Sequence, residues 1–346
     1  MSEKKTEKIK ILIIQTAFLG DVVLTLPLIQ EIKKNIPASE IDFLCIPATS
    51  DILKNNPYIN ELIPYDKKNS GIRGLFDLVS KIRSGSYDVI ISPHRSFRSS
   101  LISFLSGAEK KISFNKSSLS FLYSDTVKYE SGIHEIQRNL KLLSSLGIFS
   151  NKIIKPELFV SVQEKRKIDS IFYEHRIREG ENFLTIAPGT VWFTKRFPEE
   201  KFIRLCDLLS GTEKKIFLIG GKDDKKVSDF IANNSKFRRF INLSGTLSVM
   251  ESAELIRRSA LIITNDSAPM HIANALGTDV CAIFGATVPE FGFFPYGEND
   301  IIFQTEGLSC RPCSIHGGKK CPVKTFECMY RINEKEIAEY VVRKLS

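Results

Sequence analysis

The sequence alternates between short runs of apolar residues and longer segments in which apolar residues recur every three or four positions. The first run, Ile9–Gln15, is rich in isoleucine and is typical of a buried parallel strand. Similar runs at Ile41–Ile46 and Val89–Ser92 follow predicted helices at Val22–Lys34 and Leu75–Ser84. Strands and helices in this rhythm predict βαβ units and a parallel sheet.

Two predicted helices contain residues that indicate where a helix starts or bends. Pro27 lies within the first predicted helix and predicts either a kink or a helix that restarts with Thr25 as its N-cap. The last predicted helix starts at Asn333, with Glu336 in the capping-box position.

The alternation starts again in the second half of the chain. The predicted strands are Phe183–Ala187, Lys215–Ile219, Phe240–Leu243, Leu261–Thr264 and Val280–Phe284, and the predicted helices are Ser161–Gly180, Pro198–Leu209, Asp223–Asn233, Ser248–Ser259 and Ala268–Leu276. We therefore expect two Rossmann-like, doubly wound α/β domains, at residues 1–165 and 166–332, with a final helix at 333–346 that can pack back onto the first domain. Open α/β sheets bind ligands at the carboxyl ends of their strands, so a central cleft is expected between the domains.

Length and charge narrow the class of protein. A chain of 346 residues is long enough for two domains at the usual size of about 100–200 residues. Lys and Arg exceed Asp and Glu by 49 to 40, which favours anionic partners such as nucleotides, phosphorylated sugars, nucleic acid or a membrane surface. The charged N-terminus has no apolar signal region and no run reaches the ~18 apolar residues of a membrane span, so a cytoplasmic location is expected.

The first candidate site follows the first predicted strand. A glycine turn at Gly20 leads into a helix and leaves the carboxylate of Asp21 at the edge of the sheet. A carboxylate in this position can accept the proton of an attacking hydroxyl group. The alternative is that Asp21 only caps the helix.

Two further loops combine hydroxyl groups with cations or with a helix N-terminus. In the loop 188–198, Lys195 supplies a point charge suited to a diphosphate, although Lys195 and Arg196 could also be a solvated pair. In the segment 264–271, Ser267 and the backbone N–H groups of the next helix form an anion site to which His271 can donate. The alternative for His271 is a purely structural histidine.

The seven cysteines include four near the C-terminus. Cys310, Cys313, Cys321 and Cys328 could hold structural zinc or an iron–sulfur cluster. Only the first pair has the tight CxxC spacing, so a set of reduced thiols is the favoured alternative.

Taken together, several segments resemble glycosyltransferase family 9, the ADP-heptose–lipopolysaccharide heptosyltransferases, and within it the heptosyltransferase II type. The segments are ILIIQTAFLGDVVLTLPL, YDVIISPHRSFRSSL, IAPGTVWFTKRFP, FLIGGKDD, NLSGTLS, TNDSAPMHIANALG and AIFGATVPEFG. The resemblance implies a GT-B fold with an N-terminal acceptor domain and a C-terminal donor domain. It also implies an inverting transfer that requires neither a metal nor another cofactor.

The resemblance assigns roles to individual residues. It implies that Asp21 is the general base and that Lys195 is the lysine on the donor phosphates. Donor binding would also involve Thr190, Asp266, Ser267 and His271, and acceptor binding would involve His94, Arg95, Ser96 and Arg98, whose two arginines could equally be solvated loop charges. The chain departs from its relatives at Ala268-Pro269, and Asp224 is the residue that the resemblance matches to a donor-ribose contact.

The implied reaction moves heptose from ADP-heptose to the anionic inner core of lipopolysaccharide, with the enzyme in the cytoplasm or peripheral on the cytoplasmic face of the inner membrane. One alternative keeps the family but changes the nucleotide-sugar donor or the acceptor. Another is a nucleotide- or RNA-binding protein without transfer activity. The sequence has no RNP-like or helix-turn-helix signature, so a nucleic-acid partner is not expected.

Overall fold

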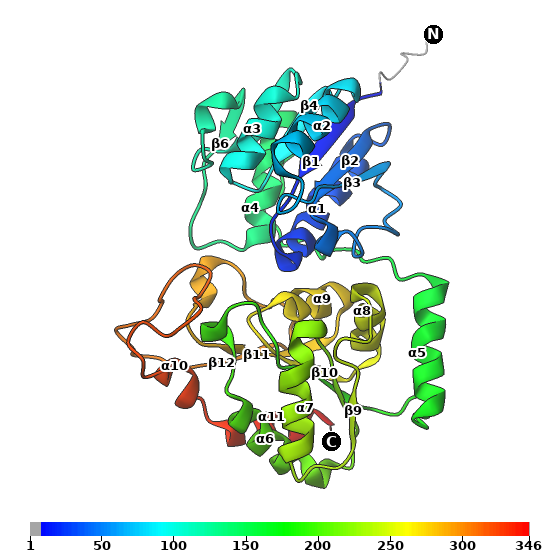
Figure 1. Ribbon diagram of the computed structural model, residues 1–346, viewed down its shortest axis with the longest axis vertical. Coiled ribbons are helices and arrows are strands. Elements are labelled where there is room, and N and C mark those ends of the chain that lie inside the picture. The colour runs from blue at the N-terminus through cyan, green and yellow to red at the C-terminus, as the bar shows by residue number, and fades with distance from the viewer. Residues whose placement is uncertain (1–7, 346) are drawn as a thin grey trace. The chain divides into compact units, whose positions relative to one another are not determined.

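The computed structural model describes residues 8–345, so most of the charged N-terminal stretch lies outside the described residues. The chain divides into two compact units, Met1–Phe159 and Val160–Ser346 (Figure 1). In the described part of the chain, no helix is long and apolar enough to cross a membrane.

The first unit is built on a six-stranded parallel sheet. Its strands are β1 (Lys10–Ile14), β2 (Glu40–Cys45), β3 (Glu61–Pro64), β4 (Val89–Ser92), β5 (Lys110–Phe114) and β6 (Asp125–Val127), in the order β3-β2-β1-β4-β5-β6. In the register of the central strands, Ile11 lies opposite both Ile41 and Val89. This strand order is that of a Rossmann-like sheet, with its switch point between β1 and β4.

The helices of this unit are α1 (Leu19–Asn35), α2 (Gly71–Ser84), α3 (Phe97–Leu105) and α4 (Glu135–Lys141). Helix α1 runs through Pro27 without a break, so the restart at Thr25, one of the two expectations for this segment, is wrong. Thr25 is buried in the helix interior, where its hydroxyl donates to the carbonyl oxygen of Asp21 at 2.8 Å and accepts from the Gln15 amide at 3.1 Å. The Thr25 hydroxyl is therefore bonded to the preceding turn and does not cap a new helix. The helix begins at Leu19, before the predicted start at Val22.

The second unit repeats the same topology. Its strands are β7 (Leu184–Ala187), β8 (Ile216–Leu218), β9 (Phe240–Asn242), β10 (Leu261–Asn265), β11 (Asp279–Phe284) and β12 (Ile301–Gln304), all parallel, in the order β12-β11-β10-β7-β8-β9. Its helices are α5 (Val162–Glu174), α6 (Glu199–Leu208), α7 (Lys225–Asn234), α8 (Val249–Arg258), α9 (Ala268–Leu276), α10 (Glu327–Tyr330) and α11 (Glu334–Leu345). The two Rossmann-like sheets expected from the sequence are confirmed.

The final helix lies within the second unit. Ile337, Ala338 and Val341 of α11 lie in the same buried cluster as the β7 side chains, and α11 packs against α6. Its start is as predicted, because the Asn333 side chain accepts a hydrogen bond from the backbone N–H of Lys335 at 3.1 Å.

The division between the units falls before α5, a few residues earlier than the expected boundary at 165. Ser161 caps α5 by accepting from the Glu164 backbone N–H at 3.3 Å. The helix is fixed to the second unit by the ion pair between Asp169 and Arg258 at 2.6 Å and by Phe172, whose ring lies 5.3 Å from that of Phe183. Helix α5 therefore belongs to the second unit.

One ion-pair network fixes α11 to α6. Glu334 contacts the Lys201 ammonium at 2.7 Å and the Arg204 guanidinium at 2.5 Å. Burial opposes ionisation of Glu334, but the hydrogen bonds from Lys201 and Arg204 outweigh it and lower the pKa of Glu334 to about 2. The ionised form therefore stabilises the fold.

We predict that Glu334→Gln lowers the free energy of unfolding by roughly 1–3 kcal/mol at pH 7. A lowered folded-state pKa gives stability that is present above the ordinary value of 4.5 and is lost as the pH falls toward 2. The difference between wild type and variant should therefore shrink between pH 5 and pH 3 in urea denaturation.

The matched control is Glu327→Gln, which removes an exposed i,i+4 pair with Arg331 and should change stability by less than about 0.5 kcal/mol. An equal loss for Glu334→Gln at pH 7 and at pH 3 would contradict the electrostatic origin of the effect.

Candidate active site

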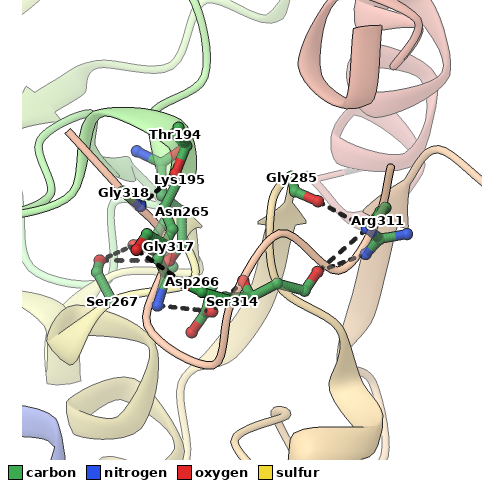
Figure 2. Close-up of polar contacts among 12 residues, drawn as sticks. Thr194, Lys195, Asn265, Asp266, Ser267, Gly285, Arg311, Ser314, Gly317 and Gly318 are labelled. Carbon is green, nitrogen blue, oxygen red and sulfur yellow. Dashed lines mark hydrogen bonds and ion pairs between the residues drawn. The ribbon is translucent and has the colours of Figure 1, made fainter. Parts of the chain in front are cut away.

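In the second unit, two loops meet at the carboxyl ends of the adjacent strands β7 and β10. Lys195 ends the 3₁₀ turn η4 (Phe193–Lys195), and Asp266 follows β10 directly. The Lys195 ammonium lies 2.7 Å from Asp266 Oδ2, and the hydroxyl of Thr287 donates to the same oxygen at 2.6 Å (Figure 2). Both charged side chains are largely buried, at 14% and 6% exposure. The structure thus brings together two of the residues singled out from the sequence.

Asn265 holds these loops in register. Its Nδ2 donates to the carbonyl oxygen of Pro188 at 2.9 Å, and its Oδ1 accepts from the backbone N–H of Phe197 at 2.9 Å. The side chain is fully buried. It therefore ties both ends of the β7 loop to β10. The TNDS motif contains Asn265, but the sequence pattern alone does not indicate this bracing role.

The remaining donor-side residues lie on the same loops. Ser267 is the N-cap of α9, and its hydroxyl donates to the backbone carbonyl of Asn265 at 3.3 Å. The carbonyl oxygen of Thr190 accepts from Arg196 at 2.8 Å, so Arg196 braces the loop and is not a freely solvated cation. His271 is buried within α9, and its ring lies 6.5 Å from that of Phe293.

A third loop brings Asp224 against the first. Asp224 accepts from the backbone N–H of Gly221 at 2.9 Å, and a Cβ placed on Gly189 would lie only 1.9 Å from its Oδ1. Gly189 thus leaves the space that the carboxylate occupies next to Thr190. Burial raises the pKa of Asp224, while the Gly221 N–H and the charge of Arg196 oppose the rise.

The cysteine-containing segment is hydrogen-bonded to the Lys195 loop. Thr194 and Gly318 exchange two hydrogen bonds: the Thr194 N–H donates to the Gly318 carbonyl at 3.0 Å, and the Gly318 N–H donates to the Thr194 hydroxyl at 2.7 Å. Arg311 fixes the base of this segment by donating to the carbonyls of Gly285 at 2.6 Å and Thr287 at 2.7 Å (Figure 2). None of these contacts was expected from the sequence.

The four C-terminal cysteines are free thiols. Burial raises the pKa of Cys328 to about 11, and the neighbouring thiols add to the rise. Within residues 8–345, no group of three or more His, Cys, Asp or Glu side chains is placed to hold a metal ion. A structural metal site at Cys310, Cys313, Cys321 and Cys328 stays a prediction.

In the first unit, Asp21 lies in the first turn of α1. Its Oδ2 accepts from the backbone N–H of Phe18 at 3.1 Å, so Asp21 does contribute to the helix start. Close to it in sequence, the Thr16 hydroxyl lies 2.9 Å from Nδ1 of His94, which joins the loops after β1 and β4. Ser96 caps α3 by accepting from the Ser99 N–H at 3.2 Å.

Arg95 is held by an aromatic ring that the sequence analysis did not identify. Its guanidinium lies 4.0 Å from the centre of the Tyr129 ring, and the guanidinium of Arg138 lies 4.4 Å from the same centre. Arg138 also pairs with Glu135, which is buried. The predicted acceptor residue Arg98 is exposed and donates to the Lys67 carbonyl at 2.9 Å.

The buried Glu135 lies within electrostatic reach of Asp21. Burial raises the pKa of Glu135 to about 7; Arg138 opposes the rise, and the negative charge of Asp21 adds to it. Asp21 also adds to the raised pKa of Tyr129, whose main cause is burial. These residues form one polar cluster in the first unit. Tyr129, Glu135 and Arg138 come from the segment 129–138, which shows no strong hydrophobic periodicity, so sequence patterns did not predict this cluster.

Two Rossmann-like units with polar and charged loops at their strand ends are typical of the doubly wound α/β class, in which ligands bind at the carboxyl ends of the strands. The chain belongs to glycosyltransferase family 9 (heptosyltransferase), whose family model matches residues 75–323. This membership confirms the family indicated by the sequence motifs.

Individual relatives agree with this membership. The chain is 29% identical over 303 residues to lipopolysaccharide heptosyltransferase 3 of Escherichia coli K12, covering 82% of this chain and 84% of the relative. Its fold is similar to that of a family 9 glycosyltransferase from Veillonella parvula (TM-score 0.86, 21% identity, 97% of each chain). It is also similar to E. coli ADP-heptose LPS heptosyltransferase II (TM-score 0.80, 21% identity, 97% of this chain and 98% of that one). These matches confirm the expected GT-B class of fold.

The contact of Gly317 with the Lys195 loop can be tested by mutation. Gly317 has φ +81°, and a Cβ there would lie 2.9 Å from Lys195 Cγ and 3.1 Å from Thr194 Oγ1. We predict that Gly317→Ala lowers the free energy of unfolding by roughly 2–4 kcal/mol, from the left-handed backbone and the clash together.

The matched control is Gly307→Ala, because Gly307 has φ +72° but an added Cβ would meet nothing within 4 Å. It should lose only about 1–2 kcal/mol in the same urea titration. Equal losses for the two variants would show that the Gly317 contact does not restrict the site.

Proposed function

We propose that this chain is an inverting, metal-independent heptosyltransferase that moves heptose from ADP-heptose to the inner core of lipopolysaccharide. The observation that carries the proposal is the buried Lys195–Asp266 pair at the N-terminus of α9, on the strand ends of a family 9 protein. Donor identity is supported by the family and by the similarity in fold to a heptosyltransferase whose structure contains ADP.

The donor diphosphate would bind between Lys195 and the start of α9. The ammonium is held in one place by Asp266, so little side-chain freedom remains to be lost when a phosphate binds. The Ser267 hydroxyl and the backbone N–H groups of the first turn supply further donors. As the sugar leaves, charge builds up on the diphosphate, and these fixed donors stabilise it without a metal ion.

Three other residues complete the proposed donor site. Thr190 lies on the Lys195 loop, and the carboxylate of Asp224 next to it can accept hydrogen bonds from ribose hydroxyls. His271 lies one turn into α9, where it would support the phosphate-binding turn from the buried side, packed near Phe293.

Asp21 would be the general base. The acceptor hydroxyl attacks the anomeric carbon as the bond from that carbon to the diphosphate breaks, and Asp21 takes the hydroxyl proton. One displacement of this kind inverts the configuration at the anomeric carbon. The nearby Glu135 and Arg138 set the charge around this carboxylate.

The acceptor would be recognised by the first unit. Arg95, fixed on the Tyr129 ring, and the exposed Arg98 can both bind phosphate groups of an acidic inner-core sugar, with His94 and Ser96 at the same loop. The family relationship supports a lipid-linked acceptor and hence a place on the cytoplasmic face of the inner membrane. The curated relatives include both heptosyltransferase 3 and heptosyltransferase 2, so acceptors that differ in the number of heptoses already present would distinguish the types.

The base is tested with Asp21→Asn. We expect acceptor-dependent ADP release from ADP-heptose to fall by about 10²–10⁴-fold, because no carboxylate takes the proton, while the affinity for ADP stays within about twofold. The control is Asp51→Asn, which removes a surface pair with Lys54 and should leave the rate unchanged. Full activity of Asp21→Asn would reject the assignment.

The donor site is tested with Lys195→Ala. Loss of the ammonium should weaken ADP binding at least tenfold in calorimetric titration, since a charge-assisted contact with the diphosphate is removed. Lys225→Ala removes an exposed i,i+4 pair with Asp229 and should bind ADP as the wild type does.

A panel of other nucleotide sugars tests the alternative within the family. Release from ADP-heptose alone supports the proposal, whereas release from a different donor would keep the site and change the substrate. Nucleotide binding without release from any donor would favour a non-catalytic protein.

A further inference from the structure

Helix α3 has an inverted distribution of polar and apolar side chains. Its buried side includes Ser99, Ser100 and Ser103, whereas Phe97 and Phe104 are exposed. The buried hydroxyls are satisfied locally; that of Ser103, for example, donates to the Ser99 carbonyl at 2.9 Å. A surface helix normally points its apolar residues inward, so the outward phenylalanines indicate that this face has a partner.

The neighbouring elements add to the same surface. Helix α2 exposes Ile72 and Phe76, four residues apart on one face, and the 3₁₀ turn η2 (Ser120–Leu122) exposes Phe121. Together, Ile72, Phe76, Phe97, Phe104 and Phe121 are 50–79% exposed, and we name them the phenylalanine patch.

These elements lie side by side in the first unit. Helix α3 packs against α2 (Figure 1). It also packs against η2. Arg98 of α3 donates to the Lys67 carbonyl just before α2, and the Tyr123 hydroxyl, next to η2, donates to Ser100 at 3.2 Å. The patch is therefore carried by one connected part of the fold.

The segments that carry the patch are rich in basic residues. The segments 66–84, 95–105 and 115–123 contain eight Lys and Arg residues but only two Asp and no Glu. Lys68, Arg73, Arg98 and Lys116 are exposed. Aromatic side chains between cations suit the interface of an anionic bilayer, where rings enter the headgroup region and cations meet lipid phosphates. A second copy of the same patch would bring like charges together, which disfavours self-association through it.

We propose that the phenylalanine patch docks the first unit onto an anionic lipid bilayer. The patch borders the acceptor loop, because Phe97 directly follows Ser96 and lies next to Arg98. Docking would hold that loop at the membrane surface that carries a lipid-linked acceptor; this last step rests on the proposed function, whereas lipid binding does not.

The test is co-sedimentation of the full chain with vesicles of phosphatidylcholine alone or with phosphatidylglycerol. The wild type should bind the anionic vesicles and release them at high salt. The triple variant Phe76→Ser, Phe104→Ser, Phe121→Ser should lose at least tenfold in partitioning, with an unchanged unfolding midpoint. The control variant Phe149→Ser, Tyr173→Ser, Phe230→Ser removes exposed aromatic residues on other elements and should bind as the wild type does.

A charge-reversal pair tests the basic component. Lys68→Glu, Arg73→Glu, Lys116→Glu should abolish binding to anionic vesicles, whereas Lys165→Glu, Lys226→Glu, Lys236→Glu, which makes the same net change elsewhere, should retain most of it. An equal loss of vesicle binding in both variants would show that binding depends only on net charge. That result would overturn the proposal that the patch is the docking surface.

Two other results would also overturn the proposal: no binding of the wild type to anionic vesicles, or full binding by the phenylalanine variant. A dimer that becomes monomeric in that variant, with vesicle binding unchanged, would assign the patch to self-association. A delipidated, water-soluble acceptor separates this inference from the proposed function. Wild-type chain that binds vesicles but releases no ADP with any acceptor would reject the transferase proposal and leave the patch standing.

Discussion

The buried ion pair between Lys195 and Asp266 is the constraint around which the second unit is arranged. Removing two charges from water is costly, and their attraction compensates only when the geometry is good and further hydrogen bonds are made. Here the pair lies at 2.7 Å and Thr287 donates to the same carboxylate oxygen. The pair can form only because β7 and β10 are neighbours in a parallel sheet and because Asn265 fixes the loop between Pro188 and Phe197.

The cluster around Tyr129 in the first unit fixes two arginines, and only one of them forms an ion pair with a carboxylate. Tyr129 offers its ring to both Arg95 and Arg138, a contact that orients a guanidinium yet leaves its N–H groups able to donate. Arg138 forms an ion pair with the buried carboxylate of Glu135. Among the residues that the structure describes, Arg95 forms no such pair with a carboxylate. The same ring thus supports one structural arginine and one that suits an anionic ligand.

The sequence predicted the features that local patterns encode. Apolar runs located the strands β1, β2, β4 and β7–β11, and because parallel strands end at one edge, their following loops could be expected to meet; the Lys195–Asp266 contact follows from this reasoning. The prediction from sequence failed where two contacting residues are far apart in the chain, and where a helix buries polar residues and exposes apolar ones. Helix α3 buries serines, β6 has only three residues, and Gly317 approaches Lys195 from a segment about 120 residues away. The roles of Asp21 and Lys195 and the cleft between the domains stay predictions.

The two units differ in how they present positive charge, and the difference matches the size of the two proposed ligands. In the second unit, Lys195 is buried, paired with Asp266 and carried on a loop that backbone contacts fix. This arrangement suits a small anion that can be enclosed, because fixed donors stabilise the negative charge that develops on a leaving group. In the first unit, the basic residues on the segments of the phenylalanine patch, Lys68, Arg73, Arg98 and Lys116, are exposed, which suits a ligand that stays attached to a larger surface. One fold used twice can therefore serve an enclosed substrate and a tethered one, because the parallel sheet fixes only where the loops begin, and the side chains decide what each set of loops can hold.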